Sequence, residues 1–137
     1  MKKKIKIILD SNIWISFLIT KSMKGIDNLI FNDKAVLLFS EELMTEFIDV
    51  TSREKLKPYF TKENIASLID LIEEYGEIVK VKSKIDICRD KEDNFLLSLA
   101  KDGKADFLIT GDKDLLVIKN FGKTIIISLA DFLQKYK

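Results

Sequence analysis

The sequence predicts one α/β domain built on a mainly parallel sheet with helices on both faces. Short runs of β-branched and aliphatic residues have the length of buried strands, and segments with helical spacing lie between them. Strands that alternate with helices imply crossover connections, which make neighbouring strands parallel. The chain of 137 residues is about the size of one ordinary domain. We therefore expect residues 1–137 to form a single domain with one active site.

Five segments are predicted to be strands. Each is short, apolar and rich in β-branched residues, which is typical of strands buried on both faces of a parallel sheet. In chain order they are Ile5 to Leu9, Val36 to Phe39, Ile78 to Val81, Phe107 to Ile109 and Ile125 to Ile127.

Helices are predicted between these strands, because apolar residues recur there three or four positions apart. The stripes are Ile13, Trp14, Phe17 and Leu18, then Leu43, Phe47 and Val50, then Ile65, Leu68, Ile69 and Ile72. Residue types that cap helix N-termini precede charged segments at Ser40, Thr61 and Asp90. Gly76 and Gly103 mark expected helix ends. Residues 53–58 are the most irregular loop.

The chain contains no histidine, and this absence excludes several classes of enzyme site. Serine-histidine-aspartate triads, cysteine-histidine pairs and histidine-ligated zinc sites cannot form. The 23 basic and 22 acidic residues nearly balance, so the overall charge does not indicate a nucleic-acid partner. The single cysteine, Cys88, cannot form an internal disulfide. No apolar run approaches the ~20 residues that span a bilayer, so we expect a cytoplasmic protein without membrane contact.

Two predicted strands are followed by an aspartate. Asp10 directly follows the first strand, and Asp112 follows the fourth, with Gly111 permitting a tight turn before it. In open α/β sheets, ligands bind at the carboxyl ends of the strands. Either aspartate could instead cap a helix or stabilise a turn, and for Asp10 alone both interpretations stay open. The occurrence of the same arrangement twice favours a shared site.

Asp93 and Glu46 are the acids best placed to join this pair. On its predicted helix, Asp93 shares the buried side with Leu97 and Ala100, where a carboxylate is costly unless something compensates it. The positive end of the helix could supply part of that compensation. Glu46 lies at the border of an apolar stripe, three residues after Leu43. A glutamate in that position is often simply solvated, so Glu46 is the weaker candidate.

Four carboxylates that converge repel one another until a divalent cation binds between them. Oxygen-only ligation suits Mg²⁺ or Mn²⁺ better than it suits zinc. Such a site can hold one or two ions, activate a water molecule and stabilise the charge that develops during phosphodiester hydrolysis. The acids therefore predict metal-dependent phosphoryl-transfer chemistry.

These residues resemble the PIN-domain nucleases, in particular the VapC-like branch that supplies toxins of prokaryotic toxin-antitoxin pairs. The matching segments extend over nearly the whole chain: Leu9 to Asn12, Ser40 with Leu43 and Glu46, Arg89 to Asn94 leading to Ala100, Ala105 with Asp106, and Leu108 to Leu115. The segment Ile-Thr-Gly-Asp-Lys-Asp-Leu-Leu is the most specific of them. Lys91 and Glu92 stand between Asp90 and Asp93, where the commoner family pattern is Asp-Pro-Asp-Asp. This departure leaves the relative roles of Asp90 and Asp93 open.

The resemblance implies a three-layer α/β/α sandwich around a parallel sheet of four or five strands, with strands one and four adjacent. It also implies endonucleolytic cleavage of RNA that leaves a 5′-phosphate, a cognate antitoxin as partner, and a homodimer. The catalytic and metal-binding residues would be Asp10, Glu46, Asp93 and Asp112, around Mg²⁺ or Mn²⁺. Auxiliary residues would be Ser11, Asn12, Asp90, Thr110 and Asp114.

Basic and aromatic side chains near the expected mouth of the site could contact RNA. The candidates for phosphate contacts are Lys21, Lys24, Arg53 and Lys113, and those for stacking on bases are Trp14, Tyr59 and Phe60. Surface lysines are ordinary in a chain with 33% charged residues. Trp14 lies on an apolar helical stripe and suits the core or a dimer interface better than a base platform.

Two other functions stay open at this point. A haloacid-dehalogenase-like phosphatase would use Asp10 as its nucleophile, although the acid expected two residues later is Asn12 here, and the chain is short. A non-catalytic domain could use an acidic pocket to dock a basic partner peptide. Metal-dependent turnover distinguishes the nuclease from the binding domain. The need for all four carboxylates distinguishes it from the phosphatase.

Overall fold

The computed structural model describes residues 4–20, 26, 29, 32, 34–53, 55 and 57–135. The strands are β1 (Ile5–Leu9), β2 (Ala35–Phe39), β3 (Gly76–Ile78), β4 (Phe107–Ile109), β5 (Asn120–Phe121) and β6 (Thr124–Ile127). The helices are α1 (Ser11–Thr20), α3 (Glu41–Thr51), α4 (Lys62–Tyr75), α5 (Lys91–Gly103), α6 (Lys113–Leu116) and α7 (Leu129–Lys135), with a 3₁₀ turn at Lys57–Tyr59. None of the described helices is long and apolar enough to cross a membrane.

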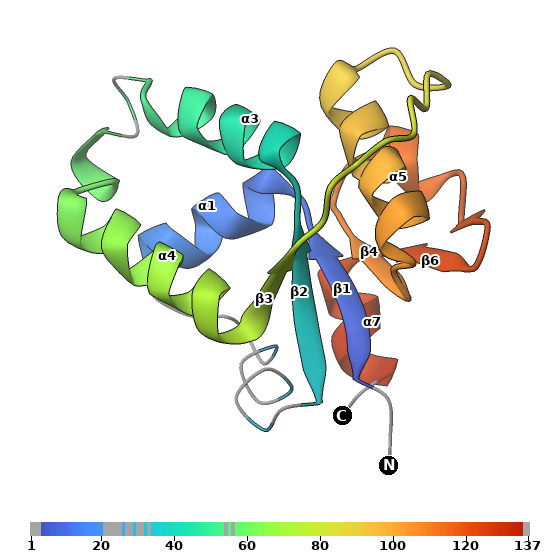
Figure 1. Cartoon of the computed structure of the whole chain (residues 1–137), viewed down its shortest axis with the longest axis horizontal. Coiled ribbons are helices and arrows are strands. Elements are labelled where there is room, and N and C mark those ends of the chain that lie inside the picture. The colour runs from blue at the N-terminus through green and yellow to red at the C-terminus, as the bar shows by residue number, and fades with distance from the viewer. Residues whose placement is uncertain are drawn as a thin grey trace.

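The strands form one six-stranded sheet in the order β3-β2-β1-β4-β6-β5 (Figure 1). Five strands are parallel, and only the two-residue strand β5 runs antiparallel to its neighbour. The chain moves outward from β1 to β3 and then crosses to β4 on the other side of β1. That reversal is the switch point at which ligands bind in such sheets. The prediction of a parallel sheet with the first and fourth strands adjacent is confirmed, whereas β5 was not predicted.

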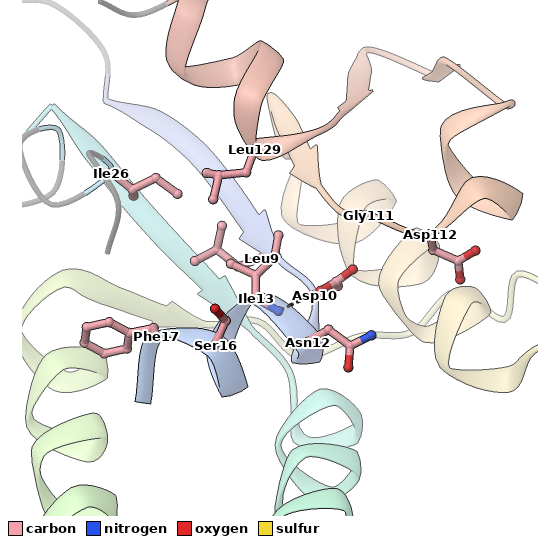
Figure 2. A pocket seen from close by; sticks show the side chains of 10 residues that line it. All are labelled: Leu9, Asp10, Asn12, Ile13, Ser16, Phe17, Ile26, Gly111, Asp112 and Leu129. Carbon is pink, nitrogen blue, oxygen red and sulfur yellow. Dashed lines mark hydrogen bonds between the residues drawn. The ribbon is translucent and has the colours of Figure 1, made fainter. Parts of the chain in front are cut away.

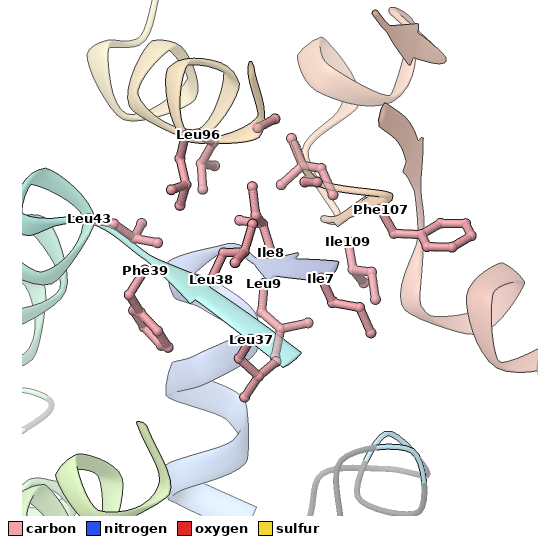
Figure 3. Packing of buried hydrophobic residues seen from close by; sticks show 14 of the residues in the cluster. Ile7, Ile8, Leu9, Leu37, Leu38, Phe39, Leu43, Leu96, Phe107 and Ile109 are labelled. Carbon is pink, nitrogen blue, oxygen red and sulfur yellow. The ribbon is translucent and has the colours of Figure 1, made fainter. Parts of the chain in front are cut away.

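Helices cover both faces of the sheet, because alternate residues of each strand point to opposite sides. On one face, Trp14 of α1 packs on Phe39 of β2 and Phe132 of α7 packs on Phe107 of β4, each pair with ring centroids 5.1 Å apart. On the other face, Leu38 of β2 points toward α5 (Figure 3). The fold is therefore the predicted three-layer sandwich.

A row of polar side chains on α5 holds the extended segment that precedes this helix. Asn94, Ser98 and Asp102, spaced four residues apart, accept hydrogen bonds from backbone N–H groups of residues 82, 83, 85, 87 and 88. Backbone groups that are not paired in a sheet need such partners. The predicted strand at Ile78 to Val81 is therefore partly wrong: β3 ends at Ile78, and the chain then runs along α5.

The predicted helix starts are confirmed. The side chains of Ser40, Thr61 and Asp90 accept hydrogen bonds from the backbone N–H groups of Leu43, Asn64 and Glu92 respectively. Gly76 follows α4 and Gly103 is the last residue of α5, so both expected helix ends are confirmed. Lys104, which follows α5, takes the left-handed conformation with φ of 54°.

Gly103 is required for packing rather than for a turn. A Cβ atom placed there would lie 2.8 Å from Cδ1 of Leu38 and 3.3 Å from Cγ2 of Val79. Gly111 is different, because its φ is not in the left-handed region and a Cβ atom would meet nothing within 4 Å. The turn before Asp112, which Gly111 was expected to permit, therefore does not use a conformation that favours glycine.

Candidate active site

Asp10 lies in the switch point, at the carboxyl end of the central strand β1. Its side chain is only 5% exposed, and both carboxylate oxygens accept hydrogen bonds. Oδ1 accepts the backbone N–H of Ile13 at 3.0 Å, and Oδ2 accepts the hydroxyl of Thr110. Asp10 therefore caps α1 with one oxygen and contacts the residue after β4 with the other. Its position is compatible both with a helix cap and with a place in a site.

Thr110 joins the ends of β1 and β4. Its buried hydroxyl donates to Asp10 and accepts the backbone N–H of Asp112 at 3.0 Å. Oδ1 of Asp112 in turn accepts the backbone N–H of Asp114 at 2.9 Å, which caps the short helix α6. Residues 100 positions apart are thus locked into one hydrogen-bonded unit at the edge of the sheet.

Asp93 lies on the buried side of α5, as its spacing predicts, and is 4% exposed. Its Oδ2 atom is buried and has no hydrogen-bond partner among the described residues. Burial, followed by the adjacent carboxyl group of Asp112, raises the pKa of Asp93 from 3.8 to about 7. The fold therefore leaves one buried oxygen acceptor unsatisfied beside a second acid.

Asp93, Asp112 and Asp114 form a compact acidic cluster. Each offers one carboxylate oxygen, and these oxygens lie within 4.8 Å of one another. Two oxygens that bind the same Mg²⁺ or Ca²⁺ ion, each at about 2.0–2.6 Å, span a similar distance. The cluster contains only carboxylate oxygens, and Asp93, whose Oδ2 has no hydrogen-bond partner among the described residues, is one of its members. These residues therefore fit a hard divalent cation.

Glu46 and Asp10 lie outside that three-residue cluster but close to a further acid, Glu92. Burial raises the pKa of Glu92, the Ser11 hydroxyl opposes this shift by hydrogen bonding, and the charges of Glu46 and Asp10 increase it. Glu46 itself is half-buried on α3, which packs against α5. The acids thus form two adjacent groups along the carboxyl edge of the sheet.

A cavity of about 380 Å³ opens beside Asp10 and Asp112 (Figure 2). Figure 2 shows the two aspartates and Asn12 toward one side of this cavity, while Phe17, Ile26 and other apolar residues line the opposite side. A ligand that fills the cavity would place one part against carboxylates and another against apolar side chains.

The remaining predicted site residues are placed as follows. Asp90 caps α5 and is exposed, and it is not part of the three-carboxylate cluster. Asn12 is exposed, whereas Ser11 is buried. Arg53 and Lys113 are exposed. Lys21 and Lys24 lie outside the described residues.

The aromatic candidates for base stacking differ in exposure. Trp14 is 1% exposed and packs on Phe17 and Phe39, so it belongs to the core. Tyr59 is 44% exposed, and Phe60 packs edge-on against Phe47. Of the three, Tyr59 alone is exposed, whereas Phe60 is partly buried and Trp14 is buried.

The structure adds two residues that were not assigned a role from sequence. Glu92 was treated only as a departure from the family pattern, although it follows an N-cap and so begins on the same turn as Asp93. Arg89 forms an ion pair with Asp114, with Nη2 and Oδ2 3.6 Å apart. The sequence indicated these residues only through the dense run of charge at residues 89–93. Such a run does not show where any one of its side chains points.

Comparisons with known proteins show the family and the fold of this chain. A family model described as PIN domain matches residues 6–114. The uncharacterized protein MJ1680 of Methanocaldococcus jannaschii is 33% identical over 130 residues, which cover 93% of this chain and 83% of that protein. A chain in the crystal structure of VapBC2 from Rickettsia felis, bound to a DNA fragment from their promoter, has a TM-score of 0.59. That match covers 89% of this chain and 97% of the other at 16% identity, so it shows a shared fold.

Proposed function

Because the chain belongs to the PIN domain family, we propose that it is an endoribonuclease that depends on Mg²⁺ or Mn²⁺ and hydrolyses RNA phosphodiester bonds. The observation that carries the proposal is the group of three carboxylate oxygens, from Asp93, Asp112 and Asp114, within 4.8 Å of one another, together with the buried Oδ2 of Asp93, which has no hydrogen-bond partner among the described residues. Such an arrangement is costly for folding alone and is explained by a ligand of positive charge.

Asp93 and Asp112 are the central metal ligands in this proposal, and Asp114 is a third. Asp10 and Glu46 complete the site from β1 and α3, with one or two ions bound in total. A bound divalent cation would lower the pKa of a water molecule and neutralise charge that develops on the phosphate.

The residues around the cation have separate tasks. Thr110 fixes the carboxylate of Asp10 and the backbone of Asp112, so two strands are held at a constant separation. Glu92 has a raised pKa and lies near Asp10, which suits a group that holds or releases a proton close to the reacting phosphate.

An antitoxin partner and a homodimer also belong to this proposal. Their support is the resemblance to the toxin branch of the family, together with a shared fold with a structure of a VapBC2 complex. The described helices leave apolar side chains exposed, among them Ile48, Ile65 and Ile69, and these are available for such contacts.

The test is cleavage of mixed RNAs by the purified protein with Mg²⁺, with Mn²⁺ and with a chelator. Asp10→Asn and Asp112→Asn are each expected to lower the rate by about 100-fold or more while the protein stays folded. Asp131→Asn, an exposed position on α7, is the matched control and should leave the rate unchanged.

Three outcomes decide between the functions. Cleavage that needs a divalent cation and both aspartates supports the nuclease. Cleavage that persists in the chelator, or in both variants, contradicts the assigned roles. Folded protein without any turnover, but with affinity for basic peptides, would support the non-catalytic binding domain.

A further inference from the structure

Arg89 is the one basic side chain recorded in contact with the acidic cluster in the part of the chain that the structure describes. Its guanidinium lies 3.6 Å from Oδ2 of Asp114, yet the Arg89 side chain is 92% exposed and the Asp114 side chain 60%. An ion pair so open to solvent contributes little to stability. Its position beside the proposed metal site therefore needs another explanation.

The backbone on both sides of Arg89 is held in place. The Asn94 side chain accepts the N–H of Cys88 at 2.9 Å and donates to the carbonyl oxygen of Cys88 at 3.0 Å. On the other side, Asp90 caps α5 by accepting the N–H of Glu92. Arg89 thus combines a fixed backbone with a side chain free to reach outward from the cluster.

We infer that Arg89 binds a phosphate of the RNA next to the proposed metal site. This inference rests on the proposed function and adds a specific substrate contact to it. Carboxylates at the site repel an incoming polyanion, so a cation fixed at the edge of the cluster offsets that repulsion. Arginine suits the task because its planar guanidinium can donate two parallel hydrogen bonds to phosphate oxygens.

In this proposal Arg89 has two alternative partners, the carboxylate of Asp114 and a phosphate of the RNA. When a cation occupies the acidic cluster, it competes with Arg89 for the carboxylate of Asp114. Arg89 would then be released toward the substrate. The ion pair keeps the side chain close to the site while no substrate is bound.

The experiment measures RNA binding rather than turnover, and uses Asp112→Asn protein so that the RNA remains intact. Binding of a short fluorescent mixed-sequence RNA is followed by anisotropy between about 50 and 200 mM salt. Arg89→Gln is expected to weaken binding about tenfold and to reduce the salt dependence by one phosphate contact, a slope change of about 0.7 for a single strand. Arg89→Lys should keep the slope and recover part of the affinity.

Lys101→Gln is the matched control, because Lys101 is an exposed cation in the last turn of α5, at the opposite end of that helix from Arg89. It should leave both the affinity and the slope unchanged. A Mn²⁺ titration without RNA, in which Arg89 is substituted in the otherwise wild-type protein, gives a second readout. Arg89→Gln should bind Mn²⁺ as tightly as the parent protein or more tightly, since a competitor for Asp114 is gone.

An unchanged slope in Arg89→Gln, or equal losses in Arg89→Gln and Lys101→Gln, would overturn the inference. Weaker Mn²⁺ binding with an unchanged slope would show that Arg89 only supports the cluster. Absence of RNA binding would also overturn it. If the wild-type protein binds RNA but cleaves none with any cation, the proposed function fails while the slope still decides the role of Arg89.

Discussion

The carboxyl group of Asp93 resists ionisation, because burial and the neighbouring Asp112 raise its pKa to about 7. A folded protein that binds this proton more tightly than the unfolded chain is most stable, with respect to this group, at low pH. The penalty is absent below about pH 4, grows as the pH rises to 7, and stays constant above that. A bound divalent cation would remove the same penalty at neutral pH.

Asp93→Asn is therefore expected to stabilise the metal-free protein at pH 7 by about 1–3 kcal/mol, because the amide carries no charge to desolvate. The measurement is the free energy of unfolding by urea in the presence of a chelator, from pH 4 to pH 8. The advantage of the variant should vanish near pH 4. Mg²⁺ should stabilise the wild-type protein and not the variant.

Asp70→Asn, on the exposed side of α4, is the control and should show no such pH dependence. A wild-type protein that is as stable as Asp93→Asn at pH 7 without metal would contradict the account of Asp93.

For individual residues, the sequence predicted the burial of Asp93 better than it predicted the partners of the charged residues around it. The buried position of Asp93 followed from helical spacing, because a side chain four residues before a core leucine shares its face. Glu92 and Arg89 illustrate the limit for charged residues: one is an acid and the other a base in one dense run of charge, and spacing alone does not say that Glu92 lies near Asp10 and Arg89 contacts Asp114. Their directions depend on how α3, α5 and α6 pack, which a single sequence does not determine.

Helix α5 organises the site as an element. Its buried face packs on the sheet, its first turn carries Asp93, and its row of Asn94, Ser98 and Asp102 holds the extended segment before it. Asp102 has a lowered pKa because it accepts hydrogen bonds from the Ser83 side chain and backbone. Close packing of α5 on β2 fixes how far Asp93 lies from the carboxyl edge of the sheet.

Gly103→Ala tests that packing. The added methyl group would meet Leu38 at 2.8 Å, and Leu38 is itself only 1% exposed, so it has little room to move. Overpacking should cost about 1–2 kcal/mol, which outweighs a gain in helix propensity of about 0.5–1 kcal/mol. The free energy of unfolding should therefore fall by about 1 kcal/mol.

Gly111→Ala is the matched control for the same measurement, since a methyl group there meets nothing within 4 Å. Its unfolding free energy should stay within about 0.5 kcal/mol of the wild type. A Gly103→Ala protein as stable as the wild type would mean that α5 does not lie as close to β2 as described.

Element prediction worked where a local signal was strong. The caps at Ser40, Thr61 and Asp90 were found because each residue type satisfies a free N–H of the next turn. The strand expected at Ile78 to Val81 begins and ends earlier in the structure, at Gly76 and Ile78. Val79 still donates to the carbonyl oxygen of Phe39 in β2, but residues 82, 83 and 85 bond to side chains of α5. Strand β5, with two residues, is too short for any periodicity to show.

The site depends on the topology of the whole molecule. Asp10, Asp93 and Asp112 come together because β1 lies between β2 and β4, and because α5 connects the two halves of the sheet. Alternation of strands and helices predicted a parallel sheet, but the adjacency of β1 and β4 came from the family resemblance. Local residue patterns predict single strands and helices but not the order of the strands in the sheet. They could therefore not place Asp10 beside Thr110.

The central claim is that carboxylates distant in the chain share a divalent cation, and a calorimetric titration with Mn²⁺ tests it most directly. The wild-type protein should bind one or two ions, Asp93→Asn and Asp112→Asn should each weaken binding by at least about tenfold, and Asp131→Asn should bind as the wild type does. Absence of Mn²⁺ binding, or equal binding by all four proteins, would contradict the account.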